Sequence, residues 1–263
     1  MSLRVRPAAV AGTFYPGSAS ELRDTVRGMM KEASAIPLSL APRMVIVPHA
    51  GHIYSGSVAA TAYRIMVDRS PNRIALVGPS HFVGFDGLAI PAHDRLATPL
   101  GTVAVDELAQ DLAEGGLVVR SESAHRREHS LEVQLPFLQV ALEEFSAVPL
   151  LTGDEHPERA AQVLSLVLEA GLFVVVSSDL SHYQDYETAR RLDTITAQAI
   201  VERREADLGR RSACGRTAVR AALRVAIERG WRCQLLDLRS SGDTAGPRDR
   251  VVGYGAFALG PGD

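Results

Sequence analysis

Three histidines follow closely on apolar segments of the type found in buried β-strands. The segments cover residues 44–47, 74–77 and 173–176, and the histidines are His49, His81 and His182. In an open α/β sheet, the loops that leave the carboxyl ends of the strands form the ligand crevice, so residues far apart in sequence can meet there. Since imidazole both binds metal ions and transfers protons near neutral pH, the pattern predicts a metal site or an acid/base site.

The loops that carry the first two histidines are rich in proline and glycine. His49 follows Pro48 and precedes Gly51, and His81 ends a Gly-Pro-Ser-His segment. A single loop histidine more often bonds only to the backbone. Two successive strands that end in such loops favour a shared site instead.

A carboxylate and a thiol could complete this site. Asp179 lies three residues before His182, where it could fix the tautomer of a histidine, raise its basicity or cap a helix. Cys214 lies at the predicted start of a helix over residues 215–228, and a helix N-terminus stabilises the thiolate that binds metals. The alternative for Cys214 is a small buried core residue, which is the role that we assign to Cys233 in its strand-like segment.

A further histidine and a glutamate lie in the middle of the chain. His129 and Glu132 share one face if a helix has begun by residue 129. This pair could supply a metal ligand, a hydrogen bond to a ligand, or a helix cap. Residues 125–128 (HRRE) form a charged stretch that we interpret as solvated.

The composition favours a globular protein that acts on a small molecule or on another protein. Of 263 residues, 46% are hydrophobic, which is enough for a sizeable core, and the net charge of -3 comes from well-mixed acidic and basic residues. No basic stripe indicates a nucleic acid partner, and no apolar segment approaches the roughly 20 residues of a membrane span. Two cysteines are too few for a disulfide framework, so we predict free thiols in a cytoplasmic protein.

Strand and helix patterns alternate along the chain and indicate one α/β domain over residues 1–263. We expect a central, mixed but largely parallel sheet flanked by helices. Strands are predicted at residues 44–47, 74–77, 88–90, 101–105, 147–151, 173–176, 233–238 and 251–259. Helices are predicted from residue 18 or 20 to about 33 and at about 55–67, 106–114, 131–143, 157–170, 187–203 and 215–228, with Pro136 bending or restarting the helix at 131–143.

Several motifs in a fixed order along nearly the whole chain resemble the Memo family. They are AGTFYP (11–16), PHAG (48–51) with YSG (54–56), GPSH (78–81), EHSLEVQLP (128–136), SSD (177–179), CGR (214–216) and VGY (252–254). In bacteria and archaea the family is called AmmeMemoRadiSam system protein B, and its animal members mediate receptor-driven cell motility. The family is similar in fold and in the position of its pocket to class III extradiol ring-cleavage dioxygenases, so the resemblance implies that fold.

The resemblance implies that His49, His81 and Cys214 are the metal-binding residues. The dioxygenases hold Fe(II) with two histidines and a glutamate, whereas cysteine takes the carboxylate position in this chain. A thiolate is softer than a carboxylate and is itself oxidisable. The resemblance to the dioxygenases makes iron(II) the first expectation for the cofactor. The thiolate makes copper and zinc alternatives.

The same resemblance makes His182 the counterpart of the acid/base histidine of the dioxygenases. We take Asp179, His129 and Glu132 as the further catalytic candidates. His52 stands where the family commonly has tyrosine after Pro-His-Ala-Gly. We expect its side chain to face outward from the loop, and if it turned inward it could add a ligand.

Three functions follow from these expectations. The first is a metal-dependent oxidoreductase of extradiol dioxygenase type. The second is a non-catalytic protein that binds a peptide or a partner protein, or that handles metal; a basic, aromatic-lined rim would favour it, although aromatic residues make up only 5% of the chain. The third is a metal-assisted hydrolase with His182 or Glu132 as base. The family name also implies AMMECR-type and radical S-adenosylmethionine proteins as partners.

Overall fold

Five parallel strands form the middle of the sheet. The computed structural model describes residues 3–153 and 156–262, and within them twelve strands belong to one sheet. The central strands lie in the spatial order β6 (Gly101–Val105), β8 (Ser146–Thr152), β3 (Arg73–Pro79), β9 (Phe173–Ser177) and β2 (Met44–Val47). Each is parallel to its neighbour.

Shorter or antiparallel strands close both sides of this parallel core. Beside β2, β12 (Val251–Gly260) runs antiparallel and pairs in turn with β11 (Arg232–Ser240) and β10 (His182–Gln184). At the other side, β5 (Arg95–Thr98) is antiparallel to β6, and β1 (Val5–Arg6) is parallel to β5. The strand β4 (Leu88–Ile90) pairs with β8 and with β7 (Val119–Arg120). The predicted mixed, largely parallel α/β architecture is confirmed.

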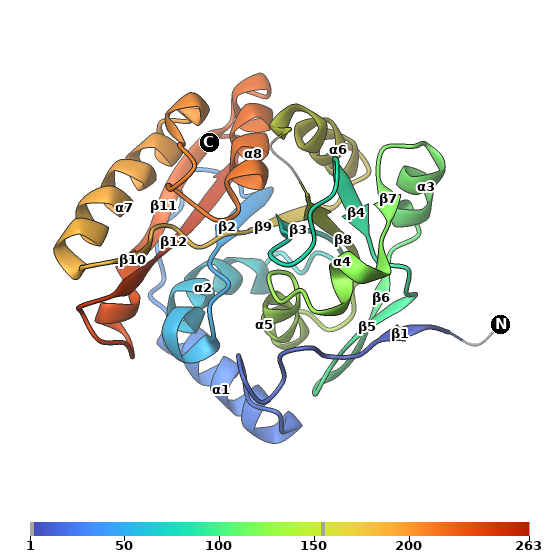
Figure 1. Cartoon of the computed structure of the whole chain (residues 1–263), viewed down its shortest axis with the longest axis horizontal. Helices are drawn as coiled ribbons and strands as arrows, with labels where there is room; N and C mark the ends of the chain where they lie inside the picture. The colour runs from blue at the N-terminus through green and yellow to red at the C-terminus, as the bar shows by residue number, and fades with distance from the viewer. Residues whose placement is uncertain (1–2, 154–155, 263) are drawn as a thin grey trace.

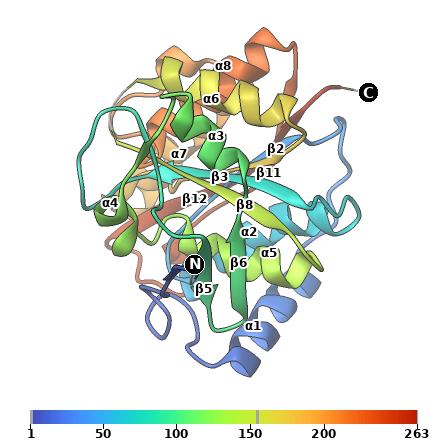
Figure 2. The same cartoon turned by 90° about the vertical axis from the view of Figure 1, so that its right-hand side faces the viewer.

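Helices cover both faces of the sheet, as Figure 2 shows from the side. The strand β2 explains the layering: Met44 and Ile46 belong to one apolar cluster, whereas Val45 and Val47 belong to the other. Alternate side chains of a strand point to opposite faces, so a strand buried on both faces is apolar throughout. The helices are labelled in Figure 1. One cluster takes in α1 (Ala19–Glu32), α2 (His52–Val67) and α5 (Leu135–Ala141). The other takes in α3 (Leu108–Glu114), α6 (Pro157–Glu169), α7 (Tyr186–Val201) and α8 (Arg216–Glu228).

The helix boundaries follow local sequence signals. Ser18 caps α1 by accepting a hydrogen bond from the Glu21 N–H, and Asp185 caps α7 in the same way. Pro136 restarts a helix, as one of the two alternatives predicted: a 3₁₀ turn, η1 (Glu132–Gln134), ends there and α5 begins with the proline in its first turn. The remaining short helices are α4 (Glu122–Arg126), η2 (Glu205–Asp207) and η3 (Ser241–Asp243).

The carboxyl ends of three neighbouring central strands bring the predicted site together. In the register of the sheet, Val47 of β2 lies beside Ser177 of β9, and Val77 of β3 lies beside Val176 of β9. The loops that carry His49 and His81, and the segment after β9, therefore leave the same edge. This is the edge at which open α/β sheets bind their ligands.

Candidate metal centre

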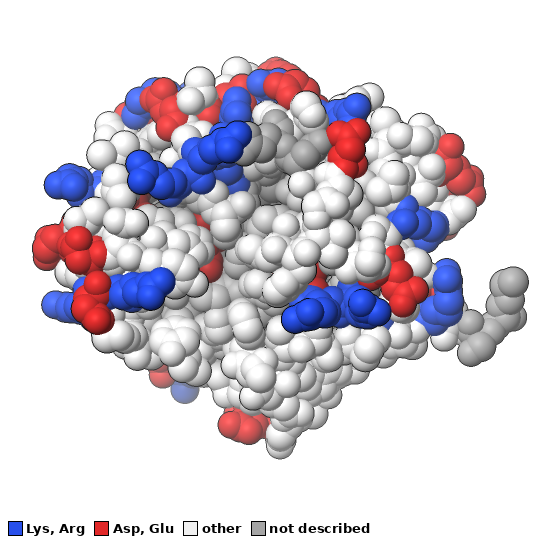
Figure 3. All heavy atoms as spheres, in the orientation of Figure 1, with Lys and Arg blue, Asp and Glu red and all other residues white. Residues whose placement is uncertain are grey.

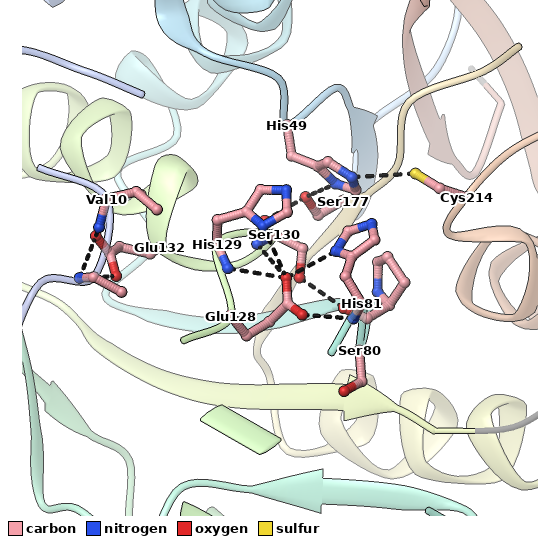
Figure 4. A network of polar contacts seen from close by, with 12 residues as sticks. Val10, His49, Ser80, His81, Glu128, His129, Ser130, Glu132, Ser177 and Cys214 are labelled. Carbon is pink, nitrogen blue, oxygen red and sulfur yellow. Dashed lines mark hydrogen bonds and ion pairs between the residues drawn. The ribbon is translucent and has the colours of Figure 1, made fainter. Parts of the chain in front are cut away.

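His49, His81 and Cys214 converge at this edge (Figure 4). Their ligand atoms all lie within 4.8 Å of one another, and Nε2 of His49 is 3.1 Å from Sγ of Cys214. Two ligands of one transition metal ion, each bound at about 2.0 to 2.3 Å, are separated by a similar distance. The structure therefore brings together the three residues that the family resemblance indicates.

Close packing of the α8 start against the end of β9 places the thiol. A side chain at Gly215 would have its Cβ 2.6 Å from the Ser177 carbonyl oxygen and 2.7 Å from the Ser178 Cβ, so only glycine fits. The Cys214 N–H donates to the Asp179 carbonyl oxygen at 3.2 Å, and the Asp179 N–H donates to the thiol sulfur at 3.3 Å. These contacts lock the sulfur in position beside His49.

Burial keeps His49 neutral. The side chain is 2% exposed, and burial followed by the nearby His81 lowers the pKa of His49 well below its ordinary value. A neutral imidazole has one nitrogen with a free lone pair, which is the form that binds a metal. His49 is thus ready for coordination at neutral pH.

His81 is held by a buried carboxylate. Glu128 accepts hydrogen bonds from Nδ1 of His81 at 2.9 Å and from the His81 N–H at 2.6 Å, and it also accepts the N–H groups of His129 and Ser130. Burial alone would raise the pKa of Glu128, but these bonds together lower it to about 2. Because Nδ1 of His81 faces the carboxylate, its Nε2 is left for an ion, as in many histidine-bound metal sites.

The thiol behaves differently from the expectation for a helix start. Burial first, and then the charge of Asp179, raise the pKa of Cys214 above its ordinary value, so the helix N-terminus does not produce a free thiolate. A metal ion would take the place of this proton, since ligand cysteines bind as thiolates. Two imidazoles with available nitrogens and a half-buried thiol fit a transition metal ion.

The site opens into a pocket of about 720 Å³, which is also lined by the other catalytic candidates His182, Asp179 and His129. Nδ1 of His182 donates to the Leu180 carbonyl oxygen at 2.9 Å, which leaves its Nε2 unprotonated in the neutral ring. Burial raises the pKa of Asp179 to about 6, although its bond from the His49 N–H opposes the change. The ring of His129 stacks on His81, with centroids 4.6 Å apart.

Aromatic and basic side chains form the rim of the pocket, which the overall composition had not indicated. Of the chain's seven Phe and six Tyr residues, five line it. Phe82 is 53% exposed with Arg127 over its ring, and Tyr183 is 61% exposed with Arg250 over its ring. Figure 3 shows groups of Lys and Arg side chains around a hollow in this face. The rim can therefore bind aromatic and anionic groups.

Glu132 lies apart from the cluster of histidines (Figure 4). Its buried carboxylate pairs with Arg6 at 2.6 Å, accepts the Tyr15 hydroxyl at 2.6 Å and accepts the N–H groups of Ala9 and Val10. With these partners it anchors the N-terminal segment, whose Phe14 forms one wall of the pocket. Glu132 is not among the residues that line this pocket.

His52 does not face outward as expected. It is buried at the start of α2, between Tyr15 and Phe137, and its Nε2 donates to the Val133 carbonyl oxygen at 3.0 Å. The turn of the chain into α2 points this side chain into the core rather than toward Cys214. Burial lowers the pKa of His52 to about 4.

Three supporting residues were not among the predicted site residues. Glu128 was interpreted as part of a solvated stretch, but it is buried beside His81, and His125 of the same stretch is buried as well, whereas Arg126 and Arg127 are exposed. The other two are Ser177, which is hydrogen-bonded to His49, and Gln134, which donates a hydrogen bond to Ser177. All three stand within or beside the quoted motifs, so the motifs were the available signal.

Comparison with known proteins identifies the family. A family model described as Memo-like protein matches residues 6–258. The chain belongs to the Memo family. Among similar relatives, each described as a MEMO1 family protein, that of Nitrosopumilus maritimus is 33% identical over 96% of this chain and 98% of its own. Those of Archaeoglobus fulgidus and Aquifex aeolicus are each 34% identical, over 97% and 96% of this chain and 99% and 98% of their own.

The fold also has a relative among solved structures. The uncharacterised protein JW3007 from Escherichia coli K12 superposes with a TM-score of 0.51 at 15% identity, over 81% of this chain and 99% of that chain. At this level of identity the likeness concerns the fold alone. Among the described residues of this Memo-family chain, no helix combines the length and the apolar character needed to cross a bilayer.

Proposed function

We propose that this Memo-family protein is a metal-dependent oxidoreductase that acts on a small aromatic molecule. The observation that carries the proposal is the convergence of two imidazole nitrogens and one thiol on the wall of an open pocket. A metal ion held by His49, His81 and Cys214 would supply a redox centre and a Lewis acid for a substrate oxygen. Iron(II) is our first choice, with copper and zinc as the alternatives that a thiolate also suits.

Two side chains of the pocket would hold or move protons. Nε2 of His182 is unprotonated in the neutral ring and can accept a proton from a substrate hydroxyl. Asp179, with its pKa raised to about 6 by burial, changes protonation within the range in which many enzymes work. We assign the acid/base role to His182 and a supporting role to Asp179.

The aromatic lining would orient the substrate. Phe14, Phe82 and Tyr183 line the pocket, and aromatic side chains favour a planar aromatic molecule. Arg250 is a basic residue of the same lining and would neutralise an acidic substituent. An oxidisable aromatic acid therefore agrees with both features.

Metal content and turnover test this proposal together. The protein would be purified without oxygen and its metals measured by mass spectrometry, alongside His49→Ala, His81→Ala and Cys214→Ser. Cys233→Ser is the matched control, because Cys233 is buried in β11. We expect a near-stoichiometric metal in the wild type and in the control, and its loss in the three ligand variants. Full metal binding without consumption of any phenol or catechol by the loaded protein would refute the oxidoreductase.

The exposed rim supports a second function, the binding of a peptide or a partner protein. Phe82 and Tyr183 are apolar surfaces with an arginine over each ring, and aromatic and arginine residues dominate binding energy at protein interfaces. The AMMECR-type and radical S-adenosylmethionine proteins implied by the family grouping would be the first partners to test. Association that survives Cys214→Ser but not Phe82→Ala would favour this function over catalysis.

A further inference from the structure

Ser177 is the residue that contacts the far side of the His49 ring. It is fully buried at the end of β9, and its Oγ lies 2.9 Å from Nδ1 of His49. A serine hydroxyl has one proton to donate and lone pairs to accept with. Which atom donates in this contact decides the tautomer of His49, and therefore whether Nε2 has its lone pair free for an ion.

The other contacts of Ser177 settle the direction of this bond. Its Oγ lies 2.6 Å from the Ser130 carbonyl oxygen, which can only accept, so the hydroxyl proton is used there. Nε2 of Gln134 donates to Oγ at 2.8 Å. The Gln134 amide is itself oriented, because Oε1 accepts the Tyr63 hydroxyl at 2.8 Å and Nε2 also reaches the Pro48 carbonyl oxygen. The remaining bond on Ser177 must then be donated by Nδ1–H of His49.

We propose that Ser177, oriented by Gln134, is a positioning residue that holds His49 in the neutral Nδ1–H tautomer and turns the Nε2 lone pair toward Cys214 and the metal. The inference rests on the metal site of the proposed function, but not on catalysis. It assigns His49 a neutral support, in contrast to the charged carboxylate that supports His81. A serine fixes the tautomer without favouring the protonated ring, which suits a histidine that is fully buried.

Nitrogen-15 NMR of the metal-free protein tests the tautomer directly. In the wild type at pH 7, we expect a protonated Nδ1 and an unprotonated Nε2 in His49, assigned by comparison with His49→Ala. In Ser177→Ala we expect a shift toward the Nε2–H form, in which the ring donates to the Cys214 sulfur. The control is Ser130→Ala, which removes a neighbouring buried hydroxyl bonded to the Pro79 carbonyl oxygen but keeps the Ser130 carbonyl group. It should retain the wild-type tautomer.

Cobalt(II) titration, followed by the thiolate-to-metal absorption band, tests the consequence. We expect Ser177→Ala to bind about 10- to 100-fold more weakly than wild type, and Ser130→Ala to stay within about twofold. An Nε2–H tautomer in the wild type would overturn the assignment even if cobalt binds well, and the proposed function would then stand without it. An equal loss of affinity in both serine variants would also overturn it, since the effect would then be general disruption. Absence of cobalt binding in the wild type would instead refute the metal site itself.

Discussion

Replacing Glu128 with glutamine should weaken both the fold and the metal site. The carboxylate is buried and accepts four N–H donors, two of them from His81. An amide of the same size has only one oxygen to accept with, and its NH₂ group would face donors. The perturbation therefore keeps the volume and removes the charge and half of the acceptors.

The pKa of Glu128 gives the expected magnitude. Folding lowers this pKa from 4.5 to about 2, and at about 1.4 kcal/mol per unit the difference corresponds to about 3 kcal/mol of stability. The folded pKa is depressed, so this contribution is present above pH 4.5 and disappears as the pH falls toward 2. At pH 7, Glu128→Gln should lower the free energy of unfolding by about 3 kcal/mol, which corresponds to a fall of roughly 6 to 12 °C in Tm. The difference from wild type should shrink below pH 4.

Two assays on the metal-free and metal-loaded protein separate the roles of Glu128. Urea unfolding without metal reports the stability, and cobalt(II) titration reports the affinity, which we expect to fall about 10- to 100-fold. Glu132→Gln is the matched control, because Glu132 is a second buried glutamate four residues away whose partners are Arg6 and Tyr15. It should lose stability and keep its affinity. The reasoning is refuted if Glu128→Gln binds cobalt like wild type, or if both variants lose affinity equally.

Three further changes test other parts of the structure. Because the pKa of Cys214 is raised, cobalt binding at pH 8 should release about one proton, and the affinity should rise about tenfold per pH unit. Calorimetry in buffers of different ionisation enthalpy measures this proton release, and Cys214→Ser should abolish the proton release. Below pH 6.5 His52 is protonated in the unfolded chain, whereas in the folded chain it stays neutral down to about pH 4. Between these pH values the free energy of unfolding of the wild type, measured in urea, should therefore fall by about 1.4 kcal/mol per pH unit relative to that of His52→Gln. Tyr183→Ala should raise the KM for an aromatic substrate several-fold and leave cobalt affinity unchanged.

The central strands could be predicted because burial on both faces imposes a continuous apolar sequence. Residues 44–47 and 173–176 were predicted as strands, and the structure confirms β2 and β9 there. The short strands β1, β5, β7 and β10 were not predicted. Each has two to four residues, so it exists through pairing with a partner strand rather than through its own pattern.

The three residues that could hold a metal ion could be named from the sequence, but the residues that orient them could not. His49, His81 and Cys214 have side chains suited to only a few kinds of chemistry. The family resemblance carried by the motifs names them as one set. The role of Ser177 depends on its register beside Val47, which only the assembled sheet shows. The charged residues 125–128 were predicted to be solvated, which is wrong for two of them. The two arginines face solvent, whereas the flanking histidine and glutamate are buried. Average composition likewise concealed the aromatic rim, because five aromatic residues meet at one pocket.

The charges around the site favour a divalent ion. His49 is neutral, Cys214 would bind as a thiolate, and Glu128 beside His81 is ionised at neutral pH. A divalent ion would be balanced by this thiolate and this carboxylate, which matters because an uncompensated buried charge is costly. The backbone N–H of Asp179 donates to the same thiol, and burial raises the pKa of its carboxyl group to about 6, so this group is ionised at pH 7 and adds a further negative charge. Protonation of Asp179 below about pH 6 would therefore remove one negative charge beside an ion held by His49 and Cys214.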